Sequence, residues 1–152
     1  MTRDQLLQRL ERGWTALTDS YAGLSDAQLT EPGVAGDWSV KDMLAHITTW
    51  EDEALAHLPT ISAGGRPPKY VSYGGLDAFN AETSARKRAL SLADVLRQMD
   101  DTHRQLLDYI AGVPDELFAT DTRFRHRLRL DTYSHYPLHA EMIRAWREAH
   151  GV

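Results

Sequence analysis

GDWSVKDMLAHITTW, residues 36–50, carries the strongest fold signal in the chain. Ser39 followed three residues later by Asp42 resembles a capping box, the pair of side chains that begins many α-helices. The apolar residues after it recur at steps of three and four, which is the spacing of one helix face: Val40, Met43, Leu44, Ile47, Trp50, Ala54 and Leu58. We therefore predict an amphipathic helix from Ser39 to about His57.

Outward from this stretch, three other segments show the same helical spacing. They cover residues 2–22, residues 76–111 with a bend near Ser91, and residues 131–149. The Gly- and Pro-rich segment from Pro59 to Gly75 reads as a long surface loop that borders a site. The alternation in residues 123–130 is the only candidate strand, and a lone strand has no partner for its backbone hydrogen bonds. We predict an all-α fold, a four-helix bundle in a single domain that spans residues 1–152.

The composition narrows the class of protein. At 152 residues the chain supports one hydrophobic core, and no apolar stretch approaches the roughly 20 residues that span a membrane. We expect a cytoplasmic protein with no membrane partner. The net charge of −5 argues against a nucleic-acid partner. The arginines that alternate in residues 123–129 leave open a local phosphate or carboxylate contact, against the alternative of a solvated connecting segment.

The chain contains no cysteine, so a metal ion must be held by histidines and carboxylates. Any thiol chemistry would need a low-molecular-weight thiol as a cosubstrate. His135 and His139 stand four residues apart, which places both imidazoles on one helix face. The helix face that carries these two histidines continues through Met142, Ile143 and Trp146, so we expect the pair to face the bundle interior. Two packed core histidines are the alternative for this pair taken alone.

A third ligand has to come from another helix, and His46 fits that requirement. It flanks the apolar line of the helix that begins at Ser39, although a lone histidine there can also be a packed core residue. Three inward-facing histidines from two helices are harder to explain by packing, because each one needs a hydrogen-bond partner in the same place.

Three segments then resemble a known family in order and spacing over nearly the whole chain. Residues 36–47 with Trp50 and Glu51 look like the second-helix signature of the DinB-like superfamily, in particular its ClbS/DfsB branch. Residues 131–146, DTYSHYPLHAEMIRAW, resemble the last helix of that branch, and residues 77–82, DAFNAE, resemble its middle segment. The resemblance implies a four-helix bundle, a homodimer, and a metal site formed by His46, His135 and His139.

Pro137 is a departure to be explained, since it lies between the paired histidines. A proline inside a helix removes an amide donor and crowds the carbonyl four residues earlier. Either the helix begins near Ser134, with Pro137 in its first turn, or the helix is kinked. The spacing of four survives only in the first case.

Around the metal we assign further roles to neighbouring residues. Glu51 is a candidate catalytic proton acceptor, with a surface carboxylate as the alternative. Trp50 and Asn80 are assigned to the substrate pocket, with a polar contact between helices as the alternative for Asn80. His103 falls on an apolar line, where a buried, hydrogen-bonded histidine is the simpler interpretation.

Three imidazoles leave an open position on the metal, which suits catalysis, and zinc is the first choice and nickel the second. We expect a metal-dependent enzyme that acts on a small electrophilic metabolite, by hydrolysis or by thiol transfer as a thiol S-transferase. The resemblance adds a role in detoxification or self-protection. The alternative is a binding module of the same fold that sequesters its ligand without turnover.

Overall fold

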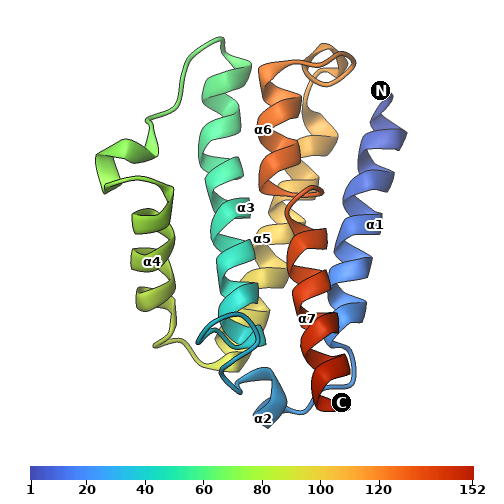
Figure 1. Cartoon of the computed structure of the whole chain (residues 1–152). Helices are drawn as coiled ribbons and strands as arrows, with labels where there is room; N and C mark the ends of the chain where they lie inside the picture. Colours follow the sequence, from blue (N-terminus) through green and yellow to red (C-terminus); the bar gives the residue numbers. More distant parts are fainter.

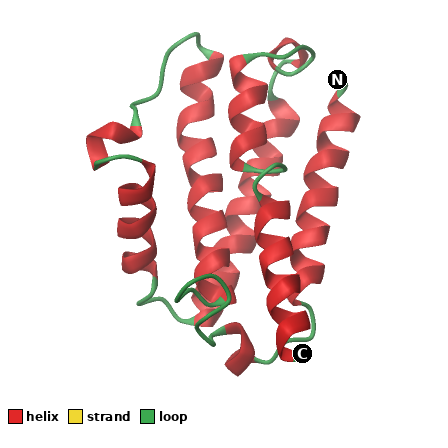
Figure 2. Cartoon of the chain, in the orientation of Figure 1, coloured by secondary structure: helices red, strands yellow, loops and turns green.

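The structure is a computed structural model that describes residues 1–152, and it is all-α as predicted (Figure 2). Four long helical rods lie side by side and form the bundle (Figure 1). The rods are α1 (Arg3–Tyr21), α3 (Val40–Ser62), α5 (Leu92–Gly112) and a fourth that is divided into α6 (Arg123–Asp131) and α7 (Tyr136–His150). The prediction of a four-helix bundle is confirmed.

Shorter elements connect the rods. The turn between α1 and α3 contains α2 (Asp26–Leu29), and η2 (Asp115–Leu117) follows α5. After α3 the chain leaves the bundle, forms η1 (Tyr70–Tyr73) and returns through α4 (Leu76–Lys87), which lies outside the four rods beside α3 (Figure 1). The loop predicted from Pro59 to Gly75 is therefore shorter than expected, because α3 continues to Ser62 and η1 occupies part of the rest.

The start of α3 confirms the capping box. The Ser39 hydroxyl accepts a hydrogen bond from the Asp42 amide at 3.1 Å, and the Asp42 carboxylate accepts one from the Ser39 amide at 2.9 Å. Two amide donors that the helix itself cannot satisfy are thereby satisfied, an arrangement worth about 1 kcal/mol.

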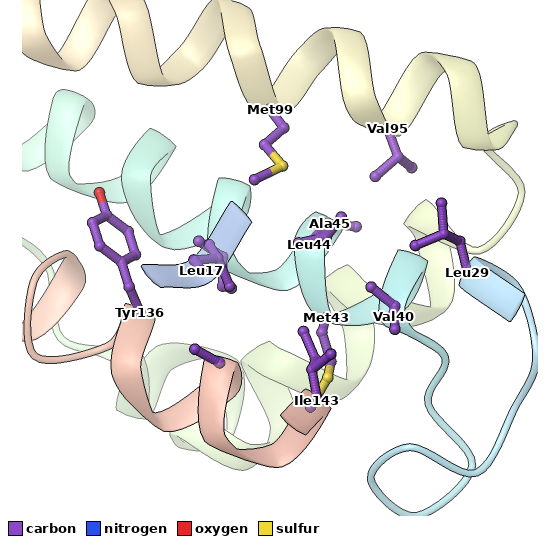
Figure 3. Packing of buried hydrophobic residues seen from close by; sticks show 12 residues of the cluster. Leu17, Leu29, Val40, Met43, Leu44, Ala45, Val95, Met99, Tyr136 and Ile143 are labelled. Atoms are coloured by element: carbon purple, nitrogen blue, oxygen red, sulfur yellow. The ribbon is translucent and has the colours of Figure 1, made fainter. Parts of the chain in front are cut away.

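Two apolar clusters hold the bundle together, one at each end of α3. The first packs α3 residues 40–47 against α1, α5 and α7 and includes Leu17, Met99 and Tyr136 (Figure 3). The second packs Ala54 and Leu58 against the ends of α1, α5 and α6. Each buried leucine or isoleucine stabilises the fold by roughly 1.5–3 kcal/mol. Between the clusters α3 carries buried polar side chains, and the candidate site lies at this level.

The segment before the last helix differs from the prediction. Residues 123–130, predicted as a connecting segment with at most a lone candidate strand, belong to α6. Thr122 caps this helix by accepting a hydrogen bond from the Arg125 amide. Its buried residues Phe124 and Leu128 stand four apart, and the alternating arginines obscured this helical spacing. The last helix accordingly begins at Tyr136 and not near Asp131. No helix is long and apolar enough to cross a membrane. The homodimer stays a prediction.

Candidate metal centre

The three predicted ligands converge in the middle of the bundle. His46 comes from α3, His135 directly precedes α7, and His139 lies in the first turn of α7. The Nε2 atom of His135 lies 3.1 Å from that of His46 and 2.9 Å from that of His139. One ligand atom from each of the three residues falls within 4.8 Å of the other two.

The position of Pro137 explains how the pair on α7 keeps its geometry. The helix begins at Tyr136, so Pro137 occupies the first turn, where the missing amide donor breaks no helical hydrogen bond. His135 stands just before the helix, and its ring still meets that of His139. Of the two possibilities raised by the sequence, the structure shows the one without a kink.

Burial keeps all three imidazoles neutral. It lowers the pKa of His46 and of His135 to about 3, with the neighbouring imidazoles adding to the effect. It lowers the pKa of His139 to about 4. At neutral pH each ring therefore carries a free lone pair, which is the form of histidine that binds metal ions.

The donor set fits a divalent cation. Three nitrogens held about 2.0–2.1 Å from a tetrahedral ion lie roughly 3.3 Å apart, close to the two observed separations of 2.9 and 3.1 Å. The far ring nitrogens, Nδ1 of all three histidines, are buried without a hydrogen-bond partner. The cluster thus lacks the outer hydrogen bonds that usually orient ligating imidazoles. Packing by itself does not account for three such rings.

A cavity of about 400 Å³ opens beside His46 and His135. Its apolar wall consists of four side chains from four elements: Trp50, Tyr70, Leu76 and Leu130. Its other polar residues are Asn80, Arg127 and Asp131. Trp50 and Asn80, the two residues assigned to a pocket from the sequence, thus lie together in its wall, and the Trp50 indole donates a hydrogen bond to Asn80 Oδ1 at 3.0 Å.

The part of this cavity that α6 provides was not predicted from the sequence. Arg127 donates through Nε to Asp131 Oδ2 at 2.6 Å and through Nη2 to the Tyr70 hydroxyl at 2.6 Å. Arg127 and Asp131 stand four residues apart, the usual spacing of an ion pair on a helix. That signal becomes readable only when residues 123–131 are recognised as a helix.

The Glu51 side chain does not line the cavity, although that of its neighbour Trp50 does. It is 1% exposed, accepts a hydrogen bond from the Tyr136 hydroxyl at 3.0 Å, and meets His103 Nδ1 at 3.2 Å. Five residues along a helix correspond to a rotation of about 140°, so Glu51 points away from the direction of His46. Its catalytic role stays a prediction, and its observed contacts are with His103 and Tyr136. His103 is buried and hydrogen-bonded, as its apolar line suggested.

Solved structures share this fold over nearly the whole chain. DfsB, described as a sibling lethal factor precursor, aligns at a TM-score of 0.80 with 17% identity and covers 99% of this chain and 97% of its own. An uncharacterised protein from Escherichia coli UTI89 aligns at 0.82 with 14% identity over 99% and 95%. The colibactin self-resistance protein ClbS, solved in complex with a dsDNA, aligns at 0.79 with 13% identity over 97% and 96%. No curated protein matches the chain.

The ClbS complex corrects one expectation. The net charge of −5 was taken to exclude a nucleic-acid partner, and this exclusion is wrong, because a protein of the same fold was solved bound to duplex DNA. Net charge sums over the whole surface, whereas a phosphate backbone responds to the local arrangement of cations.

The family assignment rests on sequence as well as on fold. The family model of the DinB superfamily matches residues 9–142. DfsB and ClbS share the fold, in agreement with the branch that residues 36–51 and 131–146 resemble. The chain belongs to the DinB superfamily.

Proposed function

We propose that this protein is a metal-dependent enzyme that acts on a small electrophile, by hydrolysis or by transfer to a low-molecular-weight thiol. One observation carries the proposal: three neutral imidazole nitrogens converge, and two of these residues, His46 and His135, line a cavity of about 400 Å³. Buried neutral histidines with no other partner suit a cation, and a neighbouring cavity of this volume suits a small ligand.

In this proposal His46, His135 and His139 hold the ion, with zinc as the first candidate and nickel as the second. A bound divalent ion acts as a Lewis acid that lowers the pKa of a water molecule or thiol. Trp50 and Asn80 contact the substrate. The apolar wall of the cavity excludes water from the reacting group, which strengthens every electrostatic interaction inside.

The carboxylates near the cavity bear on the choice between hydrolysis, thiol transfer and capture. Asp131 is the single carboxylate in the cavity wall, and Arg127 binds it at 2.6 Å. Glu51 is tied to Tyr136 and His103. A hydrolase usually positions a free carboxylate or imidazole to take a proton from water. The arrangement therefore favours thiol transfer over hydrolysis, and it keeps ligand sequestration without turnover as the alternative function.

The first test is metal content, measured by plasma mass spectrometry on the tag-free protein after dialysis against a weak chelator. We expect about one equivalent of metal in the wild type and, since one of three ligands is lost, much less in His46→Ala. His57→Ala is the matched control, because His57 lies on the same helix and pairs with Glu53 at 3.1 Å. Equal metal content in the wild type and His46→Ala would contradict the proposed site.

The second test separates catalysis from capture. An epoxide and an activated alkyl halide are offered to the metal-loaded protein, with and without added thiol. Loss of substrate beyond one equivalent supports an enzyme, and dependence on thiol supports group transfer. Consumption that stops at one equivalent supports the sequestering module. A role in detoxification or self-protection follows from the catalytic outcome and fits the self-resistance described for ClbS.

A second candidate function is binding to duplex DNA, and a specific surface favours it. A groove of about 410 Å³ between α1 and α6 contains Arg9, Arg12 and Arg125 with two glutamines and the Met1 terminus, and no acidic side chain. Three arginines without a carboxylate suit a phosphate backbone. ClbS supports the proposal, since it was solved with a dsDNA.

The DNA proposal is tested by fluorescence anisotropy with a labelled duplex of about 20 base pairs. We expect Arg9→Gln/Arg12→Gln to weaken binding by about tenfold and to reduce its salt dependence, because two phosphate contacts are lost. Arg97→Gln/Arg104→Gln is the matched control, since both arginines are exposed on α5 and pair with aspartates. Equal affinities of the two double variants would contradict the groove.

A further inference from the structure

Aromatic rings form much of the cavity wall beside the histidines. The ring centroids of Trp50 and Tyr70 lie 5.2 Å apart, and Phe79 packs behind both at 5.4 and 5.0 Å. Leu76 and Leu130 complete the apolar lining. Such a surface binds a largely apolar molecule better than a polar one, because binding removes the apolar surfaces of both partners from water.

The charges in the cavity cancel. Arg127 and Asp131 form an ion pair at 2.6 Å, with side chains 16% and 5% exposed. In the metal-free cavity an anion gains no net attraction from this ion pair and loses its hydration, and the same holds for a cation. The ligand that suits this cavity is therefore uncharged.

Two of the hydrogen-bonding groups left over in the cavity are donors. Asn80 uses its Oδ1 atom to accept from the Trp50 indole, which leaves its amide NH₂ group without a partner in the chain. The Tyr70 oxygen accepts from Arg127 Nη2, so the hydroxyl hydrogen of Tyr70 points elsewhere. Burial raises the pKa of Tyr70 to about 12, and the hydroxyl remains a donor at neutral pH.

We propose that the cavity selects an uncharged, largely apolar electrophile that presents an acceptor oxygen of the carbonyl type, which the Asn80 amide and the Tyr70 hydroxyl hold by hydrogen bonds. The inference deepens the proposed function, since it names the substrate class of that site. Hydrogen bonds to a carbonyl oxygen draw electron density from the carbon framework conjugated to it. Asn80 and Tyr70 thus determine specificity and also activate the electrophile.

The test uses metal-free protein and three probes of one shape. They are 2-acetylnaphthalene, which has a carbonyl oxygen, 2-ethylnaphthalene, which has none, and 2-naphthoate, which is an anion. Binding is followed by the ¹⁵N–¹H NMR signal of the Trp50 indole, because this group contacts Asn80 in the cavity wall. We expect 2-acetylnaphthalene to bind about fivefold tighter than either other probe, the effect of one or two neutral hydrogen bonds.

Asn80→Asp separates the donor from the structural role of this residue. An aspartate still accepts from the Trp50 indole but cannot donate to a ligand. We expect this variant to lose the preference for 2-acetylnaphthalene over 2-ethylnaphthalene. Ala81→Asp is the matched control, because it adds the same charge at an exposed position one residue further along α4 and should keep the preference. Tyr70→Phe should lose part of it, about two- to threefold.

Two results would overturn the inference. One is equal binding of 2-acetylnaphthalene and 2-ethylnaphthalene to the wild type, and the other is tightest binding of 2-naphthoate. Because no metal is present, the outcome does not depend on the histidine site. If the purified protein holds no metal but the probe preference is found, the proposed metal-dependent function is contradicted and the inference about ligand recognition stands. If the protein holds metal but shows no probe preference, the inference is contradicted and the proposed function stands.

Discussion

Two buried polar clusters lie at the middle of this bundle. Both contain residues of α3 and residues from the start of α7. One is the histidine cluster of His46, His135 and His139. The other, the Glu51 cluster, consists of Glu51, His103 and Tyr136. The Glu51 carboxylate accepts from Tyr136 and meets His103, and the His103 ring stacks on Trp14 at 3.5 Å. In the histidine cluster all three Nδ1 atoms lack partners, and the Nε2 atoms face one another.

The difference between the clusters separates support from function. Buried polar groups are nearly always hydrogen-bonded, and the exceptions call for a reason such as a ligand or ion. The Glu51 cluster satisfies its own members and ties the start of α7 to α3 and α5. The histidine cluster keeps ring nitrogens without hydrogen-bond partners. It lies directly beside the Tyr136–Glu51 hydrogen bond, since His135 and Tyr136 are neighbours in the chain. We infer that Glu51 and Tyr136 act as positioning residues for the candidate ligands.

The largest expected effect is the acid sensitivity of the metal-free protein. The folded chain keeps the three histidines neutral down to pH about 3 or 4, whereas the unfolded chain protonates them near 6.5. Below pH 6.5 the unfolded state thus binds more protons, and stability falls as the pH falls. Between about pH 7.5 and about pH 5 we expect a loss of roughly 2 kcal/mol for each imidazole and roughly 6 kcal/mol in all.

Urea unfolding at both pH values measures this loss, with the triple variant His46→Asn/His135→Asn/His139→Asn as the reference. The variant removes the three titrating groups but keeps polar side chains of similar size, so the contributions of buried carboxyl groups cancel in the comparison. An equal change of unfolding free energy in the two proteins would show that the histidines are not held neutral by burial.

The Glu51 cluster is broken most directly by Glu51→Ala. Removal of this buried acceptor leaves the Tyr136 hydroxyl and the His103 ring without their partner, and we expect a loss of about 3–5 kcal/mol in unfolding free energy. Glu53→Ala, on the same helix, removes a partly exposed pair with His57 and should cost less than about 1 kcal/mol. Urea unfolding at neutral pH compares the two, and equal costs would contradict the supporting role of Glu51.

Tyr136→Phe tests the link between the clusters. The loss of one hydrogen bond to Glu51 loosens the start of α7, and with it His135, so we expect metal affinity to fall about tenfold. A competition titration with a chromogenic zinc chelator measures the affinity. Tyr21→Phe is the control, because its hydroxyl makes only a contact of 3.8 Å with the Met99 sulfur. Unchanged affinity in Tyr136→Phe would mean that the clusters are independent.

The smallest expected effect has the opposite sign and comes from Asp131. Burial raises the pKa of Asp131 from 3.8 to about 6, against the lowering effect of Arg127. The folded state then binds more protons than the unfolded state between these values, so stability rises as the pH falls through that window. Between about pH 7.5 and about pH 5 we expect a gain of roughly 1 kcal/mol, which Asp131→Asn abolishes. An unchanged pH dependence of urea unfolding in the variant would contradict this.

Prediction from the sequence was most accurate where a pattern repeats within a few turns of helix. The capping box at Ser39, the inward line of α3 and the pairing of His135 with His139 all follow from spacings of three and four residues. It was least accurate where one pattern hid another, as in residues 123–131, where alternating arginines obscured the spacing of Phe124 and Leu128. The exclusion of nucleic acid failed because a sum of charges carries no information about position.

The sequence by itself determined the long helices α1, α3 and α5, the bundle and the three histidines able to hold a metal, because helical periodicity and side-chain chemistry are local properties. Only the tertiary structure decided which side chains from distant segments meet. Tyr70 with Arg127 and Glu51 with Tyr136 are separated by 57 and 85 residues. The rotation of each helix about its axis, fixed by packing across the whole core, sets such pairings, and no short stretch of sequence encodes it.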